Sequence, residues 1–390
     1  YNSIYQIKVK TLQNNLLETL SLSAFGLYFI FNFIDRGISN IFLLAALVLC
    51  TINYKCLYQA IKANGQLVLS IVAFSFYITF SGYYHNSPMS ELDNYYRFFL
   101  LLPLLSLSLN EKYVTGVISI CAATGLMHAI NVNAFFDDTF RLHGTSNVVI
   151  TYANMCATLL IICMYYIFYK NNKSYFLIVS AFIFLTLLLL TETRGPFIGV
   201  IITSIYLAFL LKRDTKSKLS FLVPVALLTV FLVSVITIPN PLGDRFKDMG
   251  KISLFKPLET DSYYLRHRMY FVMYGIEEIQ SNYFKGVGPQ NVYNRMSQSL
   301  KTKNIDKIIP ANHLHNDFLD ITVKFGITSL ILLFLIYFFI LKTKNKEHKI
   351  LLNILMIMLL SSQLTQSQFS HHQAITFFIT LFYLLRGRKL

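Results

Sequence analysis

A polar stretch of the chain, Asn312–Gly326, contains side chains that could move a proton. His313 and His315 are one residue apart, and Asn316 and Asp317 follow them directly. A histidine with an ordinary pKa of about 6.5 can accept a proton at neutral pH. An apolar run begins immediately afterwards, and ionisable groups beside membrane segments usually mark functional sites. We therefore interpret this stretch as the centre of a candidate site.

An arginine that could bind an anion lies in a short turn between two apolar runs, Thr191–Pro196. Gly195 permits a tight turn, and Pro196 suits the first position of the following helix. Arg194 would then lie beside a helix N-terminus, where unpaired N–H groups favour an anion. The alternative is an interfacial anchor in which Arg194 pairs with Glu192.

Three further arginines are candidates for the same chemistry. Arg266 and Arg268 occur in an amphipathic helical pattern, Ser262–Ile279, in which Arg266 and Tyr270 are four residues apart and share a face. Arg141 precedes another apolar run. The planar fork of a guanidinium suits two-point binding of phosphate, so these residues indicate a site that handles phosphate groups.

A metal site is the alternative use of the histidines. His313 and His315 could bind a metal, with His371 and His372 completing the ligand set. The sequence contains no pair of ligands at helical spacing, and a histidine beside arginines suits a general base better. We expect no metal and no cofactor.

The composition is that of a membrane protein. Hydrophobic residues make up 55% of the 390 residues and charged residues only 14%, whereas soluble domains average about 25% charged residues. The five cysteines have no metal-like spacing, and we expect no disulfide framework. Twelve apolar runs are long enough, or nearly long enough, to cross a bilayer: 16–34, 38–54, 66–82, 95–109, 113–130, 147–169, 175–191, 196–211, 219–238, 318–341, 350–364 and 372–386. Pro103 lies in the fourth run, where a kink or partial insertion is possible. We expect an all-α polytopic membrane protein with three parts: nine spans in 1–238, a large loop in 239–317, and three spans in 318–390.

The basic residues explain the orientation of these spans. With both termini in the cytoplasm, the inner segments carry 18 lysines and arginines and the short outer loops carry four. This asymmetry follows the positive-inside rule and places the large loop outside. The net charge of +15 thus has a topological explanation, and we expect contact with membrane lipids and not with nucleic acid. All four basic residues in the short outer loops are arginines, which fits an outer face that handles phosphate: Arg36, Arg97, Arg141 and Arg194.

Several motifs occur together in a fixed order. His315-Asn316 is followed by nine residues and Gly326, and Arg194 lies in Thr-Arg-Gly. The other elements are Arg266 four residues before an aromatic, Gly286-Val-Gly288, and Arg141 with Gly144 and Asn154. In order and spacing the set resembles the O-antigen ligase and polymerase family of bacterial envelope glycosyltransferases.

The resemblance implies a GT-C-like enzyme of the bacterial inner membrane, with its active site facing the periplasm. Such an enzyme transfers a glycan from undecaprenyl diphosphate to an acceptor sugar hydroxyl, without a metal and with inversion. In the ligase the acceptor is lipid A-core, and ligase is the function we favour. The alternatives are a polymerase that extends the lipid-linked glycan, and a non-catalytic transporter of a lipid diphosphate. By resemblance His315 is the base, and Arg194 and Arg266 bind the diphosphate. Further substrate contacts are expected at Arg141, Arg268, His313, Asn316 and Tyr270.

Overall fold

The computed structural model describes residues 2–107, 111–132, 142, 149–214, 263–305, 308–343 and 346–387. Within these ranges all regular secondary structure is helical, which confirms an all-α protein. Arg141, Gly144, the ninth expected span at 219–238 and the first part of the large loop lie outside the described residues.

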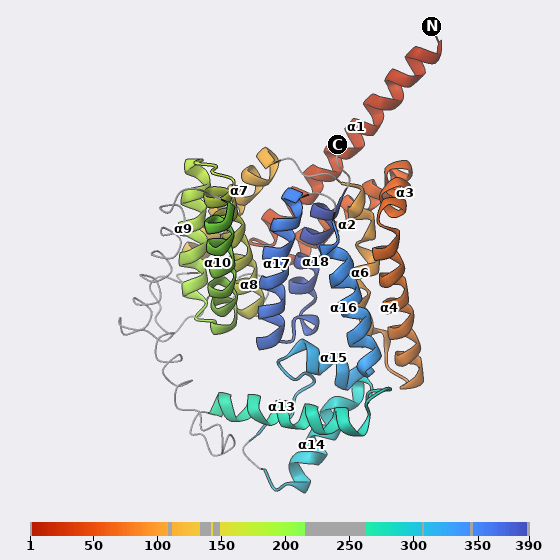
Figure 1. Ribbon diagram of the computed structural model, residues 1–390, viewed down its shortest axis with the longest axis vertical. Coiled ribbons are helices and arrows are strands. Elements are labelled where there is room, and N and C mark those ends of the chain that lie inside the picture. Colours follow the sequence, from red (N-terminus) through yellow and green to blue (C-terminus); the bar gives the residue numbers. More distant parts are fainter. Residues whose placement is uncertain are drawn as a thin grey trace.

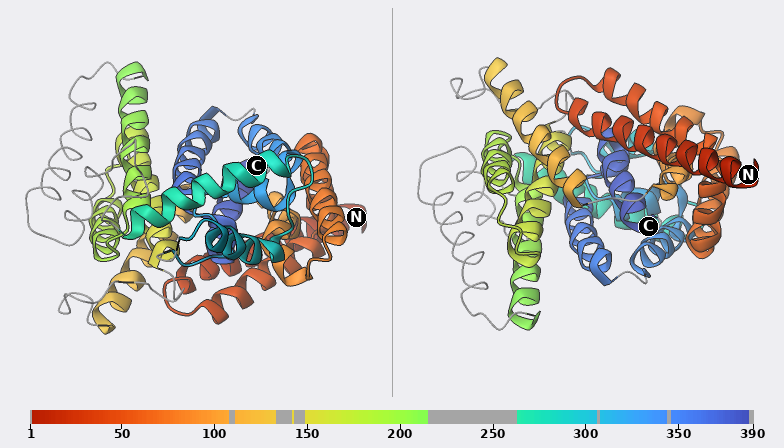
Figure 2. Two further views of the ribbon diagram at one scale, coloured as in Figure 1. Left: turned by 90° about the horizontal axis from the view of Figure 1, so that it is seen from below. Right: turned by 90° about the horizontal axis from the view of Figure 1, so that it is seen from above.

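The long helices lie side by side in a bundle, and two helices of the large loop lie across one end of it (Figure 1). Figure 2 shows the same arrangement from the two ends. The bundle helices are α1 (Asn2–Phe31), α2 (Arg36–Ile52), α3 (Tyr54–Ala63), α4 (Gly65–Tyr84), α7 (Glu111–Asn131), α8 (Val149–Met164, continued by a π-helical turn, Tyr165–Tyr169), α9 (Tyr175–Leu190), α10 (Arg194–Asp214), α16 (Ile327–Leu341), α17 (Lys346–Thr365) and α18 (His372–Arg386). The helices at the loop end are α13 (Tyr263–Ser281), α14 (Val292–Thr302) and α15 (Asp317–Phe325).

Several of these helices could cross a membrane. In the described part of the chain, five helices are long and apolar enough, or six if the bent pair α2–α3 forms one span. The five are Gly65–Tyr84, Glu111–Asn131, Val149–Tyr169, Arg194–Arg213 and His348–Thr365, and shorter apolar helices occur at Leu16–Phe31, Tyr175–Leu190 and Ile327–Leu341. Large apolar side chains on α4 face outward, with Leu69 70% and Phe76 74% exposed, as expected for a surface in contact with lipid. The chain is therefore a multi-pass membrane protein, and the number of twelve spans stays a prediction.

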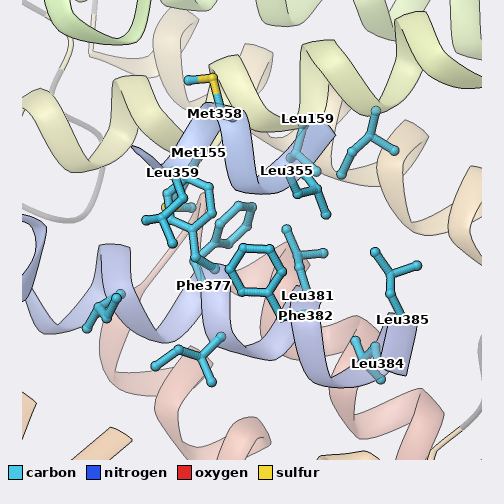
Figure 3. Close-up of a cluster of buried hydrophobic side chains, with 14 of the residues drawn as sticks. Met155, Leu159, Leu355, Met358, Leu359, Phe377, Leu381, Phe382, Leu384 and Leu385 are labelled. Carbon is cyan, nitrogen blue, oxygen red and sulfur yellow. The ribbon is translucent and has the colours of Figure 1, made fainter. Parts of the chain in front are cut away.

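The centre of the bundle is formed by α8 and α18. Every residue from Thr151 to Cys163 and from Gln373 to Leu385 is buried, as expected for helices that are apolar on all sides. Asn154 accepts a hydrogen bond from Ser362 Oγ at 2.7 Å, which ties α8 to α17. Figure 3 shows side chains of α8, α17 and α18 packed in one cluster, including Met155, Leu159, Leu355, Leu359, Phe377 and Leu381. This core fixes α17, whose carboxyl end contributes to the site described below.

Two expected spans are not single helices. Residues 93–106 form three short helical pieces, Asp93–Tyr96, α6 (Arg97–Leu100) and Leu102–Ser106, where Pro103 removes a backbone donor. The run 318–341 is divided between α15 and α16 by Gly326, whose φ is +83°. A Cβ at this position would collide with the carbonyl oxygen of Phe284, so glycine alone lets the loop pass this close. The break near Pro103 agrees with the kink considered from the sequence. A continuous span was wrong at 318–341, because hydropathy does not register a turn that tertiary contacts impose.

Candidate active site

The expected His-Asn motif forms the entrance to α15. Asn316 caps this helix, since its Oδ1 accepts hydrogen bonds from the backbone N–H groups of Phe318 at 3.0 Å and Leu319 at 3.1 Å. Its Nδ2 donates to the carbonyl oxygen of Leu364 at 3.1 Å. The amide of Asn316 is thus used within the protein, where it joins the start of α15 to the end of α17 and sets the position of the preceding His315.

His315 is held in a single orientation by three features. Its backbone has a φ of +52°, in the left-handed region that L-residues adopt at a cost of roughly 1–2 kcal/mol. Its ring stacks on Phe271 of α13, with centroids 5.7 Å apart. Its Nδ1 lies 3.2 Å from Oε1 of Gln366, which follows α17 directly. A carbonyl oxygen can only accept, so Nδ1 carries the proton and Nε2 keeps a free lone pair. That lone pair is what a general base requires.

The surroundings also hold His315 in its neutral form. Burial lowers its pKa below the ordinary 6.5, and the nearby positive charge of Arg268 lowers it further. The hydrogen bond to Gln366 and the negative charge of Asp320 act in the opposite direction but are smaller. The ordinary pKa assumed from the sequence is therefore corrected downward, and the base form persists to lower pH.

The turn that contains Arg194 packs near Gln366, the residue that contacts His315. The turn before α10 is made by Glu192, whose φ is +51°, and α10 begins at Arg194, two residues before the start expected at Pro196. A Cβ on Gly195 would lie 2.5 Å from Thr365 Oγ1 and 4.0 Å from Gln366 Cγ. The Thr-Arg-Gly turn is thus packed directly on the end of α17, so the arginine turn and the histidine meet at Gln366.

The two loop arginines lie on α13, which packs against α15. Arg268 is exposed and close enough for its charge to act on His315, and Arg266 is half-buried. Tyr270 is buried, and its hydroxyl donates to Ser299 Oγ at 3.0 Å, which places it in the packing between α13 and α14. The geometry thus brings Arg268 into the site together with Arg194 and His315.

A buried ion pair, which the sequence reasoning missed, supports the histidine loop. Lys324 Nζ lies 2.7 Å from Asp320 Oδ2, and both side chains are almost fully buried. Asp320 Oδ1 accepts from the backbone N–H of Leu314 at 3.1 Å, between His313 and His315. The available signal was the spacing of Asp320 and Lys324, an acid and a base four residues apart on one helix. Gln366 carried no such signal, because it lies 51 residues from His315 in the chain.

The glycine pair of the large loop has a structural role at the same junction. Val287 N–H donates to Val323 O at 2.8 Å, and Gly288 N–H donates to Lys324 O at 2.9 Å. Gly286 has a φ of +67°, and a Cβ there would lie 2.5 Å from Lys324 O. The loop backbone is therefore bound directly to the end of α15, which fixes the helix that His315 precedes.

Two further histidines, His313 and His371, lie near His315. The ring of His313 lies 4.6 Å from that of His315 and 6.2 Å from that of His371, measured between centroids. Burial, followed by the charge of His315, lowers the pKa of His313 to about 3 and also lowers that of His371. Among the residues that the structure describes, no group of three or more His, Cys, Asp or Glu side chains is arranged to hold a metal ion.

The site can now be compared with known proteins. Residues 179–334 match the family model described as O-antigen ligase. This part of the chain is thus similar to the O-antigen ligase family. The matched segment runs from α9 into α16 and includes Arg194, Arg268 and His315.

A curated relative covers most of the chain. An uncharacterized protein of Haemophilus influenzae is 24% identical over 307 residues, which span 73% of this chain and 76% of that protein. The apolar helices and the similarity of residues 179–334 to the O-antigen ligase family both fit a multi-pass membrane protein.

Proposed function

We propose that the protein is an O-antigen ligase, which transfers a glycan from undecaprenyl diphosphate to a sugar hydroxyl of lipid A-core. One observation carries the proposal. His315 Nδ1 lies 3.2 Å from Gln366 Oε1, an acceptor that suits a proton on Nδ1 and Nε2 as the base, and the turn of Arg194 packs on Thr365 and Gln366.

The reaction follows from the properties of these groups. His315 Nε2 removes the proton of the acceptor hydroxyl, and the resulting oxygen attacks the anomeric carbon of the glycan. The bond from that carbon to the diphosphate oxygen breaks on the opposite face, which inverts the configuration. Negative charge develops on the departing undecaprenyl diphosphate, and positioned guanidiniums stabilise it. We assign this role to Arg194 and Arg266, and Arg268 adds a positive charge that acts on the base.

The proposed location is the bacterial inner membrane, with the site facing the periplasm. The asymmetry of lysine and arginine along the chain supports this orientation. We favour the ligase over the polymerase because the large loop ends directly in His-x-His-Asn.

The test combines purified protein and lipid-linked glycan with lipid A-core or with no acceptor. Transfer to lipid A-core identifies a ligase. Ladders of longer carrier-linked glycan identify a polymerase, and binding of the carrier without products identifies a transporter.

A second experiment separates the base from a metal ligand. His315→Ala should lose most transfer and still bind the lipid-linked donor, while His313→Ala should retain more activity. Activity should survive EDTA. Loss of transfer on chelation, restored by added metal, would refute the base mechanism.

A further inference from the structure

Two arginines that the proposed reaction does not use lie together with a histidine. Arg36 begins α2, Arg97 begins α6 and His372 begins α18, so three separate segments contribute. Arg36 Nη2 lies 3.4 Å from His372 Nδ1, although the two residues are 336 positions apart. Arg97 is close enough for its charge to act on both. The fold therefore joins two of the short outer-loop arginines into one basic group.

Two hydrogen-bond donors of this basic group have no partner among the described residues. A guanidinium can only donate, so His372 Nδ1 accepts from Arg36 and the proton of the imidazole lies on Nε2. His372 Nε2 and Arg97 Nε are buried, and neither has a hydrogen-bond partner among the described atoms. Buried polar groups are nearly always paired, so these donors suit an acceptor that comes from outside the chain.

The charge around these donors is also positive. Asp93 pairs with Arg97 at 2.8 Å, but Arg36 forms no ion pair within the described residues. Asp35, its neighbour, accepts a hydrogen bond from Ile38 N–H at 2.9 Å as the cap of α2. Arg36 and Arg97 repel each other, and the N-termini of α2 and α18 add positive partial charge. A bound anion would relieve this repulsion.

The basic group is connected to the catalytic histidine. His371, next to His372, lies 6.2 Å from His313 between ring centroids, and His313 lies 4.6 Å from His315. The start of α18 therefore borders the histidine loop through His371 and the basic group through His372.

We propose that Arg36, Arg97 and His372 form a second phosphate-binding site, which binds a phosphate group of one of the two lipid substrates. The proposal rests on the proposed function in that the substrates carry phosphate. The phosphate belongs to the diphosphate of the donor or to a phosphate on the acceptor, and both use the same charge-assisted hydrogen bonds.

The experiment measures binding by the full-length protein in lipid nanodiscs. The probes are undecaprenyl diphosphate, lipid A-core, and lipid A-core from which phosphatase has removed the phosphates. The variants are Arg36→Gln and Arg97→Gln, which come from different segments in case one does not fold. The matched control is Arg295→Gln on α14, because this arginine is exposed and pairs with Glu278.

We expect roughly tenfold to a hundredfold weaker binding of one phosphate-bearing probe, which is the loss typical of one charge-assisted hydrogen bond. Weaker binding of undecaprenyl diphosphate alone assigns the phosphate to the donor. Weaker binding of lipid A-core by the variant, together with equal binding of dephosphorylated lipid A-core by variant and control, assigns the phosphate to the acceptor. Binding equal to that of Arg295→Gln for every probe overturns the proposal, as does a loss that persists with dephosphorylated lipid A-core.

Thermal unfolding without added lipid tests a purely structural role. If Arg36 only tied α2 to α18, Arg36→Gln would lower the unfolding temperature and leave binding unchanged, which would overturn the site. A binding site predicts an equal or higher unfolding temperature, because one of two repelling charges is removed. Transfer by the unmodified protein decides the proposed function separately, since the binding measurement requires no reaction.

Discussion

Replacing Gln366 with leucine removes the acceptor that holds the His315 ring. The hydrogen bond of 3.2 Å is an ordinary neutral one, worth roughly 0.5–1.5 kcal/mol. The His315 ring could then rotate, and its proton could lie on Nε2. That nitrogen would then have no lone pair with which to act as a base. Losing a residue that orients a histidine through its second nitrogen typically costs about 10–100-fold. We therefore expect kcat to fall by about 10–100-fold with little change in the KM for the donor.

The pH profile gives the more specific signature. Neutral His315 is the active form, so the rate rises with pH through its pKa and then levels off. Burial and Arg268 hold that pKa below the ordinary value, and the Gln366 hydrogen bond partly opposes them. Gln366→Leu should move the acid limb to lower pH, while Gln366→Glu adds a negative charge and should move it to higher pH.

The assay follows transfer to lipid A-core by the purified variants between about pH 4 and 8, spanning the ordinary histidine pKa. Gln363→Leu is the matched control, because its amide donates to the Tyr337 hydroxyl at 2.7 Å, one turn earlier in α17. It should leave the acid limb in place. Full activity of Gln366→Leu with an unmoved profile would refute the assignment of the proton to Nδ1.

Three more perturbations test the arrangement. Arg268→Gln should raise the pKa of His315, because the positive charge of Arg268 lowers that pKa. The acid limb of the rate profile should therefore move to higher pH. A shift with Arg266→Gln instead would reverse the assignment of the loop arginine. Asp320→Asn leaves a buried lysine unpaired and should reduce the free energy of unfolding by about 3–5 kcal/mol, and an unchanged unfolding temperature in detergent would contradict this role. Single cysteines at positions 297 and 346, in a cysteine-free background, test orientation in outer-membrane-permeabilised cells, where an impermeant maleimide should label only position 297.

The sequence by itself determined the class of the protein and the place of its main motif at the start of a helix. Few charges and long apolar runs exclude a soluble domain, because a bilayer requires apolar side chains over a helix of fixed length. The His-Asn pair before an apolar run is likewise local, and the structure places it as an N-cap as residue type and position suggest. A helix N-terminus near Arg194 was also expected from the sequence, although α10 begins at Arg194 itself and not at Pro196.

Only the tertiary structure decided which distant side chains act on the histidine. Gln366, Arg268 and Phe271 reach His315 because α13, α15 and α17 pack together, and the register of that packing has no periodic signal in the chain. The break at Gly326 depends on the carbonyl oxygen of Phe284, which no window around residue 326 contains. Hydropathy and residue spacing indicate which side of a segment faces lipid, water or the protein core. The tautomer and pKa of His315 and the helix break at Gly326 depend instead on contacts between segments far apart in the chain.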